Sequence, residues 1–276
     1  MRIPSTDGVE LKVHDLGGEG PPVLLAHATG FHGRVWEPLA AHLLGYRRWS
    51  IDMRAHGDSD VPKDRPLEWY GFADDILSVI DALELEKPFG IGHSKGAAAL
   101  LLAEQARPGT FRALYLFEPV VVPTDFVTDY NPDNPLSNGA RRRRDTFNSF
   151  DEAFDNYASK PPFNTLHPEV LRVYVDHGFG ENADGTVSLK CLPKNEAEVY
   201  AHGMSHRAFA ALPEVSCPVT IALGVENAVP AIFGRKITEA LPYGTVASFP
   251  ELTHFGPLED PETIASSILD SFSMLA

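Results

Sequence analysis

The chain has 276 residues, of which 43% are hydrophobic, and its formal net charge is -15 at pH 7. A chain of this length and composition can bury a large core, as one domain or as a domain with an insertion. The negative charge repels phosphate backbones and anionic membranes, which makes nucleic acids and membranes unexpected partners. We therefore expect a small-molecule substrate, neutral and partly apolar. Nothing in the sequence bears on the oligomeric state.

The cysteines and histidines show no spacing typical of a metal or redox site. Cys191 and Cys217 are the two cysteines, and we expect both to be free thiols that are at least half-buried. His202 and His206 are four residues apart, as in zinc helices, but the accompanying glutamate is missing. We expect neither a cofactor nor a metal ion. The chain also lacks an N-terminal apolar segment typical of secretion signals, which favours a soluble, cytoplasmic protein.

Short apolar runs alternate with segments of helical periodicity along most of the chain. In chain order, the runs that predict strands fall within 9–17, 21–30, 47–60, 87–94, 111–123, 217–230 and 244–255. The segments that predict helices fall within 35–45, 69–86, 95–108, 232–242 and 260–275. This alternation is typical of an α/β fold with a mostly parallel sheet that is covered by helices on both faces.

The alternation stops in the middle of the chain. Residues 124–213 are polar and irregular, and they suggest helices joined by proline-rich turns, with a short extended piece near their end. We expect a mainly helical cap there, lying over a core made of 1–123 and 214–276. The cap contains four consecutive arginines from Arg141, followed at once by acidic residues. We expect a solvated helix with ion pairs, and the alternative is that one arginine faces a pocket and meets an anionic substrate.

The sequence "GHSKG" ends the apolar run within 87–94 and begins a predicted helix. A strand that turns directly into a helix brings backbones too close for β-carbons at the flanking positions, which are Gly92 and Gly96. Ser94 between them would then present its hydroxyl outward, as a nucleophile does. Its proton needs a base, and His254 after the last strand is the candidate.

Together with the order of the elements, the motifs "GHSKG", "HATG", "DMRAHGDSD" and "THFGPLEDP" resemble those of the α/β-hydrolase superfamily, in its serine-nucleophile members with a helical cap. The resemblance covers roughly 9–123 and 217–275, and the cap is matched by position alone. It implies an eight-stranded type of sheet, with Ser94 as nucleophile and His254 as its base.

The resemblance leaves the acid of the triad open. Members usually carry an aspartate in the loop after the strand within 217–230, where this chain has Asn227 with Glu226 beside it. A second arrangement in the superfamily places the acid one strand earlier, which points to Glu118 here. We favour Glu118, because a carboxylate that ends a buried run needs a polar partner such as His254. Glu226, or no acid at all, is the alternative.

The resemblance also implies an oxyanion hole made of two backbone N–H groups, those of Thr29 and Lys95. Members often have a glycine where "HATG" has Ala28, which bears on the identity of the first donor. With these residues we expect a serine hydrolase that cleaves a small-molecule carboxylic ester or lactone through an acyl-enzyme. The alternatives are a C–C bond hydrolase of the same fold and a non-catalytic scaffold that binds a small ligand.

Overall fold

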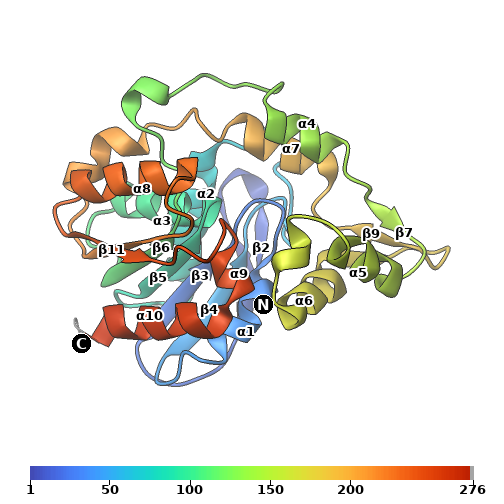
Figure 1. Cartoon of the computed structure of the whole chain (residues 1–276), viewed down its shortest axis with the longest axis horizontal. Helices are drawn as coiled ribbons and strands as arrows, with labels where there is room; N and C mark the ends of the chain where they lie inside the picture. The colour runs from blue at the N-terminus through green and yellow to red at the C-terminus, as the bar shows by residue number, and fades with distance from the viewer. Residues whose placement is uncertain (274–276) are drawn as a thin grey trace.

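The computed structural model describes residues 1–273 and is built around one large sheet (Figure 1). The strands of this sheet are β1 (Arg2–Pro4), β2 (Glu10–Asp15), β3 (Pro22–Ala26), β4 (Arg47–Asp52), β5 (Phe89–His93), β6 (Ala113–Phe117), β10 (Val219–Leu223) and β11 (Gly244–Ser248). Their spatial order is β1-β2-β4-β3-β5-β6-β10-β11. Strand β2 is antiparallel to both of its neighbours, β1 and β4. The remaining strands, which are β4, β3, β5, β6, β10 and β11 in spatial order, run parallel to one another. The predicted eight-stranded, mostly parallel α/β fold is confirmed.

Helices cover both faces of this sheet because its central strands are apolar on both sides. In β3, Leu24 and Ala26 belong to one cluster of buried side chains, while Val23 and Leu25 belong to the other. The helices of the core are α1 (Glu37–Ala40), α2 (Trp69–Ala82), α3 (Lys95–Ala106), α8 (Val229–Ala240), α9 (Gly256–Glu259) and α10 (Pro261–Ser273). Helices α2, α3 and α8 contribute to the first cluster, and α10 contributes to the second. Of the helix predicted within 260–275, the positions 274 and 275 lie outside the described residues.

The segment predicted as a cap forms a group of elements at one side of the sheet (Figure 1). Its helices are α4 (Pro135–Arg141), α5 (Phe150–Ala158), α6 (Pro168–Gly178) and α7 (Pro193–Ala201). Its strands β7 (Thr146–Phe147), β8 (Phe179–Glu181) and β9 (Val187–Leu189) make a small sheet in the order β7-β9-β8. In core and cap together, short 3-10 helices lie at Thr6–Gly8, Gly33–Trp36, Thr124–Phe126, Phe163–Thr165 and Ala208–Glu214. The boundaries of the cap as a domain stay a prediction.

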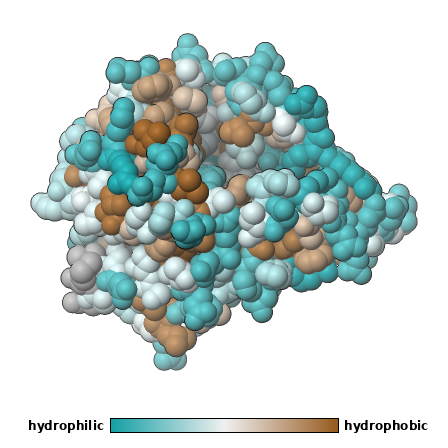
Figure 2. Space-filling model, in the orientation of Figure 1, coloured by the Kyte–Doolittle hydropathy of each residue, from teal (hydrophilic) through white to brown (hydrophobic). Residues whose placement is uncertain are grey.

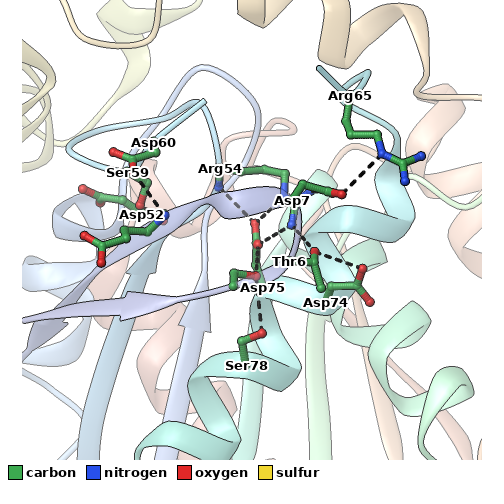
Figure 3. Close-up of polar contacts among 12 residues, drawn as sticks. Thr6, Asp7, Asp52, Arg54, Ser59, Asp60, Arg65, Asp74, Asp75 and Ser78 are labelled. Carbon is green, nitrogen blue, oxygen red and sulfur yellow. Dashed lines mark hydrogen bonds and ion pairs between the residues drawn. The ribbon is translucent and has the colours of Figure 1, made fainter. Parts of the chain in front are cut away.

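A buried ion cluster holds the loop after β4 against α2 and the N-terminal turn (Figure 3). Arg54 is 1% exposed, and its Nε and Nη2 donate to the two carboxylate oxygens of Asp75 at 3.0 and 2.8 Å. Its Nη1 donates to Asp7 at 2.9 Å. Buried charges are stable only when they are paired in this way. The cluster therefore fixes one of the loops at the carboxyl end of the sheet.

Among residues 1–273, no helix combines the length and the apolar character needed to cross a membrane.

Candidate active site

Ser94 lies on the turn between β5 and α3, with a backbone conformation that side chains rarely adopt. Its φ is 54°, and its N–H donates to the carbonyl of Phe117 on the neighbouring strand at 3.0 Å. A β-carbon on Gly92 would lie 2.5 Å from the Cα of Ala97, and one on Gly96 would lie 2.2 Å from the carbonyl oxygen of Ala26. Both glycines are therefore required by close backbone contacts, which hold Ser94 in this strained turn.

The side chains of His254 and Glu118 complete a line of hydrogen bonds from Ser94. His254 Nε2 lies 3.0 Å from Ser94 Oγ, and His254 Nδ1 lies 2.6 Å from Glu118 Oε2. Glu118 directly follows β6 and is 1% exposed, and its other oxygen, Oε1, accepts from the N–H of Gly224 after β10 at 2.9 Å. The carboxylate is thus held on both sides, with one oxygen available to the imidazole.

The structure brings Glu118, and not Glu226, to the histidine. The side chain of Glu226 is 60% exposed and lies 3.4 Å from Arg235. Asn227 beside it is exposed as well. The geometry therefore agrees with the expected placement of the acid after β6, and the catalytic roles themselves stay predictions.

His93 supports the backbone of the loop that carries His254. Its Nε2 lies 2.7 Å from the carbonyl oxygen of His254, and its ring is 1% exposed. Burial, and next the nearby His254, lower the pKa of His93 well below its usual value. A neutral His93 can donate from Nε2 to that carbonyl. The sequence pattern did not reveal this contact, although a histidine at the end of a buried strand was the available signal.

The loop after β3, which contains Thr29, adjoins the turn of Ser94. Ala26 on β3 pairs with Gly92 on β5, so the segments that follow the two strands leave the sheet side by side. His27 holds this loop in place: its Nδ1 donates to the carbonyl of Ala28 at 2.7 Å, and its Nε2 accepts from the N–H of Met53 at 3.1 Å. Thr29 is buried in this loop.

Lys95 is the first residue of α3, and its N–H belongs to the first turn, where such groups have no partner within the helix. Because the turn of Ser94 adjoins the loop of Thr29, the N–H groups of Lys95 and Thr29 belong to neighbouring segments next to Ser94. Two backbone donors from these segments are what an oxyanion hole requires.

One arginine of the cap reaches the core beside this loop. Arg143 donates from Nη1 to Glu196 at 2.5 Å and from Nη2 to the hydroxyls of Tyr157 and Tyr174 at 3.0 and 2.6 Å. A β-carbon on Gly30 would lie 2.6 Å from Glu196 Oε1, which shows how closely the pair approaches the loop of Thr29. The expectation of a solvated arginine run is therefore wrong at this position, because its guanidinium is enclosed by cap side chains, whereas the other three arginines are exposed.

Within residues 1–273, no group of three or more histidine, cysteine, aspartate or glutamate side chains could hold a metal ion. His202 and His206 each pack against an aromatic ring. The ring of His202 lies 4.7 Å from that of Tyr130, and the ring of His206 stacks on Trp69 at 5.1 Å.

Comparison with known proteins identifies the family of this chain and several of its relatives. A model of the alpha/beta hydrolase family matches residues 23–267. The chain belongs to the alpha/beta hydrolase family. A bifunctional esterase/perhydrolase from Acinetobacter calcoaceticus is 26% identical over 97% of this chain and 97% of its own. A 3-oxoadipate enol-lactonase from Acinetobacter baylyi is 34% identical over 37% of this chain and 38% of its own. This alpha/beta hydrolase thus has an esterase and an enol-lactonase among its relatives.

Solved structures share its fold over the whole chain. The crystal structure of E-2-(acetamidomethylene)succinate hydrolase superposes with a TM-score of 0.80 and 22% identity, covering 99% of both chains. At this identity the similarity shows the fold alone.

Proposed function

We propose that this alpha/beta hydrolase cleaves a small-molecule carboxylic ester or lactone, with Ser94 as nucleophile, His254 as base and Glu118 as the acid of the triad. The observation that carries the proposal is the continuous line of contacts from Glu118 through His254 to Ser94, at 2.6 and 3.0 Å. A serine hydroxyl becomes an effective nucleophile when a neighbouring base takes its proton, and the base acts best when a carboxylate orients it.

In the first half of the reaction, Ser94 Oγ attacks the carbonyl carbon while His254 Nε2 accepts the hydroxyl proton. The imidazole is then positively charged, and Glu118 stabilises it through Nδ1–H. The N–H groups of Thr29 and Lys95 bind the negative oxygen of the tetrahedral intermediate. When the C–O bond breaks, His254 returns the proton to the leaving oxygen, and the acyl group stays on Ser94.

In the second half, a water molecule takes the place of the leaving alcohol. His254 accepts one proton of that water, its oxygen attacks the acyl carbon, and the proton then returns to Ser94 Oγ as the ester bond breaks. The products are a carboxylic acid and an alcohol, or a single hydroxy acid when the substrate is a lactone. Epoxide and haloalkane chemistry on this fold needs an aspartate nucleophile, and this chain has Ser94 there.

Two relatives support esters and lactones as substrates, since one is named an esterase and another an enol-lactonase. Ester cleavage and lactone cleavage need the same attack on a carbonyl carbon, so one set of side chains serves both.

The test is labelling with a fluorophosphonate probe, which reacts with activated serines, followed by mass spectrometry of the labelled peptide. We expect the adduct on Ser94 in the wild type and none in Ser94→Ala. Ser188→Ala, which removes a serine outside the site, serves as the matched control and should label like the wild type. An unlabelled, folded wild-type protein would contradict the proposal and favour a scaffold that only binds a ligand.

A further inference from the structure

A cavity of about 230 Å³ lies between the core and the cap, and the side chains of the triad do not line it. Figure 2 shows the surface hollowed where core and cap meet, between α8 and the pair α4 and α7, so this junction is open to solvent. The cavity belongs to the same junction. Its lining comes from the start of α2, from the segment before α4 and from the segment after α7, and consists of Glu68, Trp69, Tyr70, Asp129, Tyr130, His202, Ser205 and His206.

Backbone hydrogen bonds hold two of these segments against each other. The N–H of Thr128 donates to the carbonyl of Met204 at 3.0 Å, and the N–H of Asn131 donates to the carbonyl of Ala201 at 3.0 Å. The segment before α4 is thus fixed to the segment after α7 on both sides of the lining residues. A ligand therefore meets walls that are already formed, which lowers the entropic cost of binding.

Aromatic side chains form a large part of the lining. Tyr70 and Tyr130 are 49% and 46% exposed, so both remain accessible to a ligand. Trp69 is held in place by a hydrogen bond from its Nε1 to the carbonyl of Val199 at 2.9 Å. The faces of tryptophan and tyrosine rings attract cations, because the π-electrons make them negative. The lining therefore offers ring types that suit a cationic ligand.

The charge of the lining is negative as well. Glu68 and Asp129 are exposed, and neither forms an ion pair within residues 1–273. The hydroxyl of Tyr130 donates to a further carboxylate, that of Glu198, at 2.9 Å. Burial lowers the pKa of His206 to about 4, so its ring is neutral at pH 7. Among the described residues, no lysine or arginine lines the cavity, and a cavity lined by one sign of charge concentrates ions of the other sign.

One buried polar side chain of the lining lacks a hydrogen bond. His202 is 7% exposed, and its Nε2 has no hydrogen-bond partner within residues 1–273. Glu198 Oε1 lies 3.3 Å from this nitrogen without the alignment of a hydrogen bond. Because buried polar groups are normally paired, the imidazole points to a ligand that supplies a partner. With its proton on Nδ1, it presents an acceptor beside the carboxylate, and an ammonium group can donate to both.

We propose that this cavity binds a small organic ammonium ion. The inference does not depend on the proposed function, since the triad does not line the cavity. One wall nevertheless adjoins the turn of the nucleophile. His206 Nε2 donates to the carbonyl of Val120 at 2.9 Å, and the N–H of Val120 donates to the carbonyl of Ser94 at 3.3 Å. The ammonium site therefore lies next to the catalytic turn and uses other side chains.

The first test compares phenethylammonium with 2-phenylethanol, which is nearly the same in size and shape but carries no charge. Calorimetry should show saturable binding of the ammonium ion to the wild type, with a Kd at least about tenfold lower than that of the alcohol. Tryptophan fluorescence should change in the same titration. This change should be largely lost in Trp69→Phe, which keeps an aromatic ring in the lining. The absence of saturable binding, or equal affinity for the two compounds, would overturn the proposal.

A second test places the bound ion in this cavity. The double variant Glu68→Gln/Asp129→Asn should raise the Kd of phenethylammonium about tenfold, and Tyr130→Leu should raise it about threefold. These side chains are exposed, so the variants should fold like the wild type. The matched control is Asp125→Asn, which removes an exposed carboxylate of the same segment outside the lining and should keep the wild-type Kd. An ion that binds the wild type and all variants equally would lie elsewhere, and the proposal would be wrong.

Discussion

Replacing Glu118 by glutamine tests whether the carboxylate of Glu118 orients His254 as the base for Ser94. The glutamate accepts two hydrogen bonds, from the N–H of Gly224 at 2.9 Å and from His254 Nδ1 at 2.6 Å. A glutamine has only one oxygen for these two donors. If that oxygen faces Gly224, the NH₂ group faces Nδ1, and His254 must carry its proton on Nε2. In that tautomer the imidazole cannot accept the proton of Ser94.

The size of the effect follows from this change of tautomer. The corresponding loss in other serine triads is about 10⁴-fold in kcat. We therefore expect Glu118→Gln to lower kcat about 10³- to 10⁴-fold, which corresponds to about 4–5.5 kcal/mol of activation free energy. The opposite orientation of the amide places two donors against each other at Gly224 and costs about 1–3 kcal/mol. Neither orientation of the glutamine restores the wild-type arrangement.

The assay is steady-state hydrolysis of a 4-nitrophenyl ester, with circular dichroism to show that the variant is folded. Glu226→Gln is the matched control, because the side chain of Glu226 is 60% exposed and pairs with Arg235. A surface substitution of this kind should change kcat less than about twofold. A Glu118→Gln enzyme within about tenfold of the wild-type turnover, or an equal loss in Glu226→Gln, would refute the reasoning.

Two further predictions concern other parts of the molecule. His93→Phe should lower kcat about tenfold with little change in KM, since it removes one donor from the backbone of His254, and a change confined to KM would contradict this role. Asp75→Asn should lower the free energy of unfolding by about 3–5 kcal/mol, because the buried Arg54 then keeps only the partly exposed Asp7 as a charge partner. Urea denaturation measures this loss, and Asp74→Asn, on the same helix, should cost less than about 1 kcal/mol (Figure 3).

The sequence alone predicted the sheet, because the alternation of short apolar runs with helical periodicity is a local pattern. It also placed Ser94 and His254 at the carboxyl edge of the sheet. Ser94 directly follows β5 and His254 lies in the loop after β11, and the carboxyl ends of parallel strands meet at one edge. Gly92 was informative for the same reason, since it is required by the close approach of Ala97 in the same turn, whereas Gly96 is required by a tertiary contact with Ala26 on β3.

Only the tertiary structure decided which carboxylate meets His254. Glu118 and His254 are 136 positions apart, and their contact depends on how β6, β10 and the loop after β11 are aligned. The sequence left Glu226 open, because a shift of one residue in a turn changes the direction of a side chain.

The surroundings of the two buried cations were likewise decided by packing. A run of arginines shows its charge but not which member is enclosed, and only folding brings Arg143 to Glu196, 53 positions away. Lys95 reads in the sequence as an ordinary residue after the nucleophile. Within residues 1–273 its Nζ has no hydrogen-bond partner, which appears only when every neighbouring acceptor has been placed, because the pairing of a buried group depends on its whole surroundings and not on a motif.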